Sequence, residues 1–127
     1  MKCAASISLS CLLLAGCATF GSSAPDELSA LEGEWSVDLR PSLDDAPYSQ
    51  PMRLDIDEDR NVSGLFYGSD ILAGRAGTGQ GRACVAFRTS DNSGPYQHSA
   101  CLEGDAMVGQ TWSEGRGFVL PWTATRN

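Results

Sequence analysis

Residues 82–104, RACVAFRTSDNSGPYQHSACLEG, are the stretch that decides the fold. Apolar and polar residues alternate on both sides of the sequence DNSG at positions 91–94, whose residue types favour a tight turn. This pattern predicts a β-hairpin. A turn centred on the middle of DNSG places Cys84 directly opposite Cys101. Opposed side chains in an antiparallel pair have Cβ atoms roughly 4.5–5.5 Å apart, close to the roughly 3.5–4.5 Å of a disulfide.

The register of this hairpin also sorts its side chains between two faces. Arg88 and Gln97 share one face, which we expect to meet solvent. The other face, which we expect to form the core, carries three cross-strand pairs: Val85 with Ala100, Phe87 with His98, and Thr89 with Tyr96.

The N-terminus has the pattern of an export signal. Lys2 supplies a positive start, and residues 7–15 form an apolar run too short to span a bilayer. The sequence Leu14-Ala15-Gly16-Cys17 resembles the lipobox of bacterial lipoprotein precursors. That resemblance implies cleavage before Cys17, which then receives a diacylglycerol on its sulfur and an acyl chain on its amine. The alternative is an ordinary cleaved signal peptide that ends near Ala15 or Ala18.

The same resemblance implies a location. Ala18, rather than an aspartate, follows the cysteine, which in the sorting rule of that family favours the outer membrane of a two-membrane bacterium. We therefore expect a bacterial cell-envelope protein that is anchored by lipid in the outer membrane and faces the periplasm. Several acyl chains on one residue give stable anchoring, since each buried CH₂ contributes about 0.8 kcal/mol.

The five cysteines divide between the signal and the domain. Cys3 and Cys11 would leave with the signal peptide and Cys17 would carry lipid, so Cys84 and Cys101 remain as a pair. An even number of cysteines in an exported chain predicts a disulfide, and two buried free thiols are the alternative. One histidine and two cysteines are too few for a zinc site. We expect neither a bound metal nor a cofactor.

The chain is acidic, with a formal net charge of −7 at pH 7. Loss of Lys2, the single lysine, would bring the net charge of the mature chain to about −8. This balance argues against a nucleic-acid partner, which requires a basic face. It also argues against electrostatic docking on anionic lipid, so the lipid anchor would attach the protein to the membrane.

We divide the chain into three parts. Residues 1–16 are the predicted signal peptide, residues 17–32 hold the lipidated cysteine, a tether and a short helical turn, and residues 33–127 form the β-barrel domain. Residues 18–25 are small apart from Phe20 and show no periodicity, as expected of a tether. Leu28 and Leu31 lie three apart and would plug one end of the domain that follows.

From Gly33 onward the sequence has a period of two. Strands are expected at residues 33–39, 52–57, 62–67, 71–79, in both arms of the hairpin, and at 106–112 and 117–126, with a polar loop from Pro41 to Pro51. Short strands, tight turns and no long helix predict an all-β antiparallel meander. Eight such strands can close into an up-and-down barrel, which removes exposed sheet edges.

Two motifs that resemble ligand sites have a structural interpretation instead. The run Asp55-x-Asp57-x-Asp59-x-Asn61 lacks the glycine and the glutamate that a calcium-binding EF-hand loop requires, so we expect a solvated acidic turn. The glycine-rich residues 74–81 lack the Lys-Ser/Thr of a phosphate-binding loop, so we expect a kink or bulge in a strand.

His98, the single histidine, is a candidate general base. The predicted register places Phe87 opposite it, and Tyr96 and Ala100 beside it on the same face. These neighbours include no activated nucleophile, so we expect a packed or pocket-lining histidine. We do not expect the protein to be an enzyme.

The tryptophans carry a second family resemblance. LEGEWSVDL at 31–39 is similar to the first strand of avidin-like chains, Leu-x-Gly-x-Trp-x-x-Asp-Leu, and WTATR at 122–126 is similar to their eighth, Trp-x-Ala-Thr-Arg. GQTW at 109–112 contributes the third tryptophan. A Gly-x-Trp followed by a late arginine also resembles the wider lipocalin group, in which that arginine covers that tryptophan.

This resemblance implies an eight-stranded barrel that binds an apolar small molecule, which is biotin in avidins. The polar contacts to biotin do not carry over, because Val37, Pro41 and Phe66 stand where avidins have hydrogen-bonding residues. We therefore expect a ligand other than biotin.

We predict non-catalytic binding of a small, mostly apolar molecule in the mouth of the barrel. The predicted wall residues are Trp35, Phe66, Phe87, Tyr96, His98, Trp112 and Trp122, with His98 and Tyr96 supplying polar contacts. An interior filled by tryptophans, with Arg126 as a cation–π lid over Trp35, fits the sequence equally well. The alternative function is an envelope interaction protein, such as a protease inhibitor, acting through residues 18–25 or 41–51. The sequence does not identify a protein partner.

Overall fold

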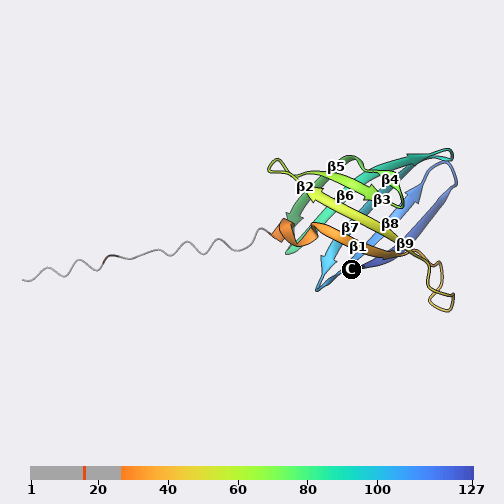
Figure 1. Cartoon of the computed structure of the whole chain (residues 1–127), viewed down its shortest axis with the longest axis horizontal. Coiled ribbons are helices and arrows are strands. Elements are labelled where there is room, and N and C mark those ends of the chain that lie inside the picture. The colour runs from red at the N-terminus through yellow and green to blue at the C-terminus, as the bar shows by residue number, and fades with distance from the viewer. Residues whose placement is uncertain (1–15, 17–26) are drawn as a thin grey trace, which may run out of the picture.

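A computed structural model describes Gly16 and residues 27–127 of the chain (Figure 1). Cys17, the predicted lipidation site, and the predicted tether at 18–25 lie outside the described residues. The described part contains one short 3₁₀ helix and nine strands. These are η1 (Glu27–Leu31), β1 (Gly33–Asp38), β2 (Ser49–Ile56), β3 (Asn61–Phe66), β4 (Ser69–Asp70), β5 (Leu72–Gly79), β6 (Arg82–Asp91), β7 (Gly94–Glu103), β8 (Ala106–Ser113) and β9 (Phe118–Arg126).

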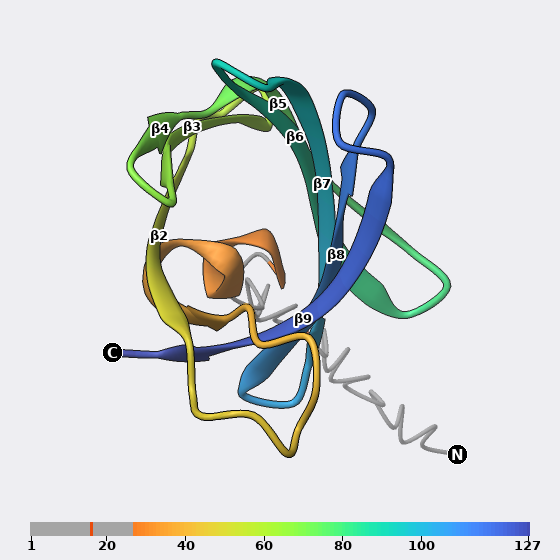
Figure 2. The same cartoon turned by 90° about the vertical axis from the view of Figure 1, so that its right-hand side faces the viewer.

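Eight of these strands form a closed antiparallel barrel, which confirms the predicted fold. The chain passes through β1, β2, β3, β5, β6, β7, β8 and β9 in order, and each strand pairs with the next. β9 then pairs with β1, with Trp35 opposite Arg126, and this pairing closes the sheet. The two-residue strand β4 pairs with the end of β3. Figure 2 looks along the barrel and shows the strands as a ring.

The hairpin of β6 and β7 has the register that the sequence predicts. Asp91 pairs with Gly94 across a two-residue turn, and Cys84 pairs with Cys101. The two cysteines form a disulfide with an S–S distance of 2.00 Å. Their neighbours Val85 and Ala100 are buried inside the barrel, so the disulfide lies on the outer face.

The helix η1 closes one end of the barrel, as the spacing of its leucines predicts. Leu28 and Leu31 are 1% and 0% exposed. Figure 2 shows η1 inside the ring of strands. The indole Nε1 of Trp35 donates a hydrogen bond to the carbonyl of Leu31 at 2.9 Å, which fixes the end of the helix to β1.

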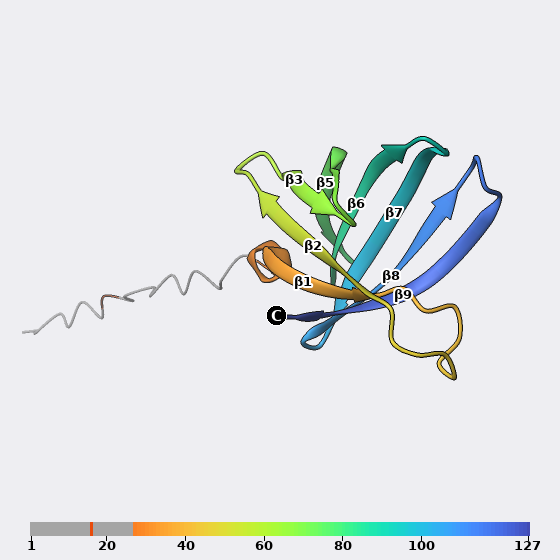
Figure 3. The same ribbon diagram turned by 45° about the vertical axis from the view of Figure 1, so that its right-hand side comes forward.

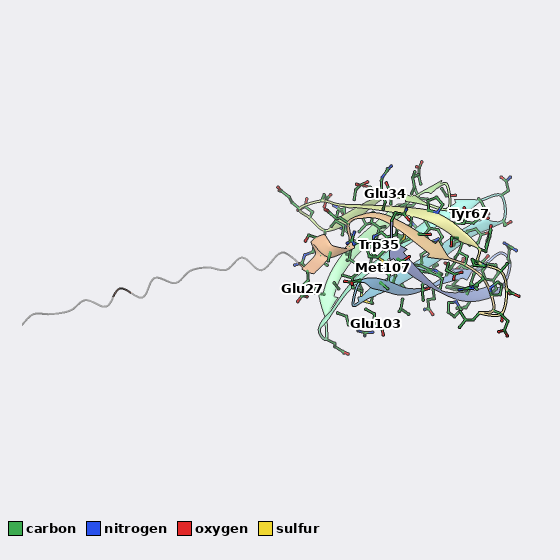
Figure 4. All side chains as sticks on the ribbon, turned by 60° about the horizontal axis from the view of Figure 1, so that its bottom comes forward. Glu27, Glu34, Trp35, Tyr67, Glu103 and Met107 are labelled. Carbon is green, nitrogen blue, oxygen red and sulfur yellow. A yellow bond between two sulfur atoms is a disulfide. The ribbon has the colours of Figure 1, made fainter. Side chains whose placement is uncertain are left out.

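The half of the barrel next to η1 is filled by side chains. Trp35, Met52, Leu54 and Met107 are each completely buried. Figure 4 shows Trp35 and Met107 in the interior, and Tyr67 toward the end of the barrel away from η1. The sequence allows either a ligand pocket or a filled interior, and this half of the barrel is filled.

The predicted boundary between the loop and β2 differs from the structure. The loop predicted from Pro41 to Pro51 ends at Tyr48, because residues 49–51 already pair with β1. Pro51 lies opposite Ser36, and its carbonyl accepts a hydrogen bond from the amide of Tyr67 at 3.0 Å. A proline is tolerated here because its missing N–H lies at the point where the pairing of β2 with β3 ends.

The glycine-rich stretch forms β5 and contains the expected irregularity. The pairing of β5 with β6 shifts register between Leu72 and Arg75. A Cβ on Gly74 would lie 2.3 Å from the carbonyl oxygen of Val62, so a larger residue would push β5 away from β3. The acidic turn after β2 is exposed, and hydrogen bonds from Asn61 lower the pKa of Asp57.

Among the described residues, no helix is long and apolar enough to cross a membrane.

Candidate ligand-binding site

The end of the barrel away from η1 contains a cavity of about 440 Å³. Figure 3 shows the turns of the β6–β7 and β8–β9 hairpins and the loop between β1 and β2 at this end. The cavity is lined by Leu39, Tyr48, Phe66, Tyr67, Ser69, Thr89, Asp91, Tyr96, His98, Thr111, Arg116, Phe118 and Leu120. The interior of the barrel is therefore filled in one half and hollow in the other, and the hollow half is large enough for a small ligand.

A buried hydrogen-bond network forms the floor of this cavity. The imidazole Nε2 of His98 lies 2.8 Å from the hydroxyl of Thr89, and its Nδ1 lies 2.8 Å from the hydroxyl of Thr111. The indole Nε1 of Trp122 donates to the same Thr111 hydroxyl at 2.9 Å. Thr89, His98 and Thr111 are 4–6% exposed. Each of these buried polar side chains thus has a partner.

Strand alternation places these four side chains together. Thr89 of β6 and His98 of β7 lie on the inner face of their hairpin, and Thr111 of β8 is directly opposite His98. Trp122 of β9 lies opposite Gly109. A Cβ on Gly109 would lie 2.6 Å from the indole of Trp122. Glycine at this position therefore gives the indole room to lie across β8 and reach Thr111.

The imidazole of His98 is held among aromatic rings. Its centroid lies 4.3 Å from that of Phe66 and 4.8 Å from that of Phe87, with the Phe87 ring stacked on it. Burial lowers the pKa of His98 from 6.5 to about 4. At neutral pH the ring is uncharged, so one nitrogen carries a hydrogen and the other accepts one.

Two tyrosines meet at the rim of the cavity. The hydroxyls of Tyr48 and Tyr67 are hydrogen-bonded, and this bond raises the pKa of Tyr67. Strict alternation continued from β3 would place Tyr67 on the face opposite Phe66, but Tyr67 lines the cavity. Tyr67 has a positive φ of 53°, so the strand has already ended and its ring turns toward the mouth.

The turn between β8 and β9 supplies the cation at the rim. The guanidinium carbon of Arg116 lies 5.1 Å from the ring centroid of Phe118, a cation–π distance. The completely buried Ser113 accepts a hydrogen bond from the amide of Arg116 at 3.2 Å. A Cβ on Gly115 would lie 2.1 Å from the carbonyl oxygen of Ser93, so this turn packs closely against the β6–β7 turn.

The predicted wall residues fall into three positions. Phe66, Tyr96 and His98 line the cavity. Trp35, Phe87 and Trp122 are buried in the packed interior outside the cavity lining, and they are 0–3% exposed. Trp112 is 48% exposed and lies on the outer face of β8, opposite the half-buried Gln97 of β7. Its neighbour Thr111 occupies the inner position instead.

Sequence reasoning missed most of the polar lining. The predicted hairpin register placed Thr89 on the inner face. Alternation along β8 from Met107 also places Thr111 on the inner face. Neither threonine was assigned to the site from the sequence, although both line the cavity. The aromatic motif drew attention to Trp112 instead. Tyr48, Tyr67 and Arg116 reach the cavity from loops, where no periodic signal exists.

The site contains no candidate metal centre, since no group of three or more metal-ligating side chains occurs in residues 27–127. The closed eight-stranded antiparallel barrel, plugged at one end and hollow at the other, is the architecture shared by lipocalin-like and avidin-like barrels. No family model, no curated protein and no solved structure matches the chain.

Proposed function

We propose that the protein is a lipid-anchored binding protein of the bacterial envelope, whose barrel holds a small, mostly apolar molecule without transforming it. The observation that supports this proposal is the cavity of about 440 Å³ at the open end of the barrel. About half of its lining residues are aromatic or aliphatic, and the others are polar or charged side chains at the floor and the rim. This combination is typical of sites for small molecules.

The non-catalytic part of the proposal rests on His98. Both of its nitrogens are paired with threonine hydroxyls, and no carboxylate takes part in these hydrogen bonds. A general base in a triad needs an orienting group and a nucleophile aimed at substrate. Here the threonines hold the ring in place, and burial lowers the pKa of His98 to about 4, so the imidazole is a weak base at neutral pH.

A direct test uses the neutral fluorophore N-phenyl-1-naphthylamine, which brightens in apolar surroundings. We expect saturable binding of one molecule per chain. Bound probe should also raise the melting temperature, since a ligand at 100 times its Kd stabilises the folded state by about 2.7 kcal/mol. Mass spectrometry of solvent extracts of the purified protein would identify any molecule that the cavity already holds.

Adjacent residues of β9 provide a matched pair of variants. Leu120 lines the cavity, whereas Val119 is 58% exposed and points outward. Leu120→Trp should fill the mouth and abolish binding of the fluorophore, while Val119→Trp should leave it unchanged. Equal binding by both variants, or no saturable binding by the wild type, would refute the cavity as the site.

The anchoring part of the proposal rests on the lipobox-like sequence that ends at Cys17. Labelled palmitate should enter the wild-type protein expressed in a two-membrane bacterium, and Cys17→Ser should remove both the label and the membrane association. The acyl chains would then supply the binding energy that the acidic domain cannot. A wild-type protein that stays unlabelled and in the soluble fraction would contradict this part alone.

The loop between β1 and β2 supports a second candidate function, in contact with another protein. Leu43 is 84% exposed, yet it lies in an ordered turn. The amide of Asp45 donates to the carbonyl of Ser42 at 3.0 Å, and the amide of Ser42 donates to the Asp45 carboxylate at 3.2 Å. If the protein is a protease inhibitor, Leu43→Asp should abolish inhibition and Leu120→Trp should preserve it.

A further inference from the structure

The hydrogen-bond network around His98 leaves one hydrogen unused. Four hydrogens are available, from the indole of Trp122, the neutral imidazole of His98, and the hydroxyls of Thr89 and Thr111. The network contains three hydrogen bonds among these groups. One hydroxyl hydrogen therefore remains, and both threonines that can carry it line the cavity.

The tautomer of His98 decides which threonine carries this hydrogen. With the hydrogen on Nε2, His98 donates to Thr89 and accepts from Thr111, so the Thr89 hydroxyl is free to donate into the cavity. Thr111 then keeps one unused lone pair. With the hydrogen on Nδ1, the roles exchange, because Thr111 accepts from both His98 and Trp122 and has its own hydrogen to spare. Thr89 then keeps the unused lone pairs.

We propose that this floor is a tautomer-adaptive polar site that selects neutral ligands carrying both a hydrogen-bond donor and an acceptor, such as carboxamides. In either tautomer one threonine donates and the other accepts, so the floor satisfies a group of that kind in two orientations. The inference rests on the proposed function, since it names the chemical class that the same cavity binds.

The floor is poorly suited to a carboxylate. A buried carboxylate has about four acceptor positions, and the floor offers it a single hydrogen. The cation that lines the cavity, Arg116, lies over the ring of Phe118 at the rim rather than at the floor. A charged group at depth would lose its hydration without an adequate replacement.

Four probes on one naphthalene scaffold test the inference by calorimetry. They are 2-naphthamide with both a donor and an acceptor, methyl 2-naphthoate with acceptors alone, 2-naphthoate with a charge, and 2-methylnaphthalene with no polar group. The amide should bind most tightly. The ester should bind about 3–10-fold more weakly, the effect of one hydrogen bond, and the carboxylate more weakly still.

A Thr89→Val variant separates an adaptive site from a fixed one. Without the Thr89 hydroxyl, the floor can donate only from Thr111, which requires the hydrogen of His98 on Nδ1. Affinity for the amide should fall about 3–10-fold, while the ester, which needs one donor, should bind as to the wild type. Thr89→Ser keeps the hydroxyl and should bind the amide with the affinity of the wild type.

Nitrogen-15 NMR of labelled histidine reads the tautomer directly, because His98 is the single histidine of the chain. The ester bound to Thr89→Val should show the hydrogen on Nδ1. A protonated imidazole at neutral pH, or a hydrogen on Nε2 in that complex, would overturn the inference. Equal binding of the amide and 2-methylnaphthalene would overturn it while leaving the proposed function intact. If no probe binds at its solubility limit, both fall.

Discussion

The guanidinium carbon of Arg126 lies 4.3 Å from the ring centroid of Trp35, so the last residue of β9 covers the tryptophan of β1. The same guanidinium donates to the carbonyl of Glu32 at 2.7 Å and to the carbonyl of Ala30. One side chain thus connects the closing strand pair to the end of η1. The lid predicted from the order of the two residues is confirmed, and it seals the end of the barrel opposite the cavity.

Replacing this arginine should destabilise the barrel without affecting the cavity. Arg126→Met keeps an apolar stem over Trp35 but removes the charge and the hydrogen bonds to η1. We expect a loss of about 2–3 kcal/mol in the free energy of unfolding, measured by urea denaturation. Arg53→Ala is a suitable control, because Arg53 pairs with Asp55 on the exposed surface and such pairs contribute about 0–1 kcal/mol. Equal losses in the two variants would refute the role of the lid.

A methyl group at Gly109 should disturb the floor of the cavity. Its Cβ would lie 2.6 Å from the Trp122 indole and 2.7 Å from the carbonyl oxygen of Ser99. Gly109→Ala should therefore cost about 1–3 kcal/mol of stability and shift the fluorescence of Trp122 as the indole leaves Thr111. Gly77→Ala, in β5, meets no atom within 4 Å and should leave both quantities unchanged. If Gly109→Ala changed neither the stability nor the fluorescence, the Trp122 indole would not need the space that the glycine leaves.

The fold could be predicted from the sequence because several independent local signals indicated the same structure. Alternation set the inner faces, the turn sequence at 91–94 set the register, and the cysteine pair confirmed it independently. The position of η1 followed from two leucines at helical spacing. Each of these signals involves residues close in sequence or directly opposite on adjacent strands.

The cavity depended on information that a sequence pattern lacks. Phe66 could either fill the half of the barrel away from η1 or border a cavity there. Which of the two occurs depends on packing across the whole barrel, not on the residues next to Phe66 in the sequence. Tyr67 enters the rim because of one positive φ at the end of a strand. Trp112 was chosen by motif, although the alternation of its own strand, with Met107 and Thr111 inside, places it outside.

Removing the disulfide should weaken the barrel without changing its fold. Cys84 and Cys101 are separated by 17 positions, and a cross-link closing a loop of that size contributes roughly 3 kcal/mol in the chain-entropy model. Cys84→Ala/Cys101→Ala should therefore unfold at lower urea concentration, and reductant should lower the wild-type midpoint but not that of the double variant. Alkylation of the native wild type without reductant should leave its mass unchanged. Labelling of two thiols would contradict the bond.

Stability should fall in mild acid because of His98. In the folded protein burial lowers its pKa from 6.5 to about 4, so between these values the unfolded chain binds a proton that the native state does not. The free energy of unfolding should therefore decrease by roughly 3 kcal/mol as the pH falls through this window, with no further contribution from His98 below it. His98→Gln keeps a polar side chain between the threonines but cannot titrate. Because the chain has one histidine, the difference between the urea-denaturation profiles of wild type and variant isolates this contribution from that of the carboxylates. Parallel profiles from pH 7 to about pH 4 would show that His98 accepts a proton in the folded barrel as readily as in the unfolded chain.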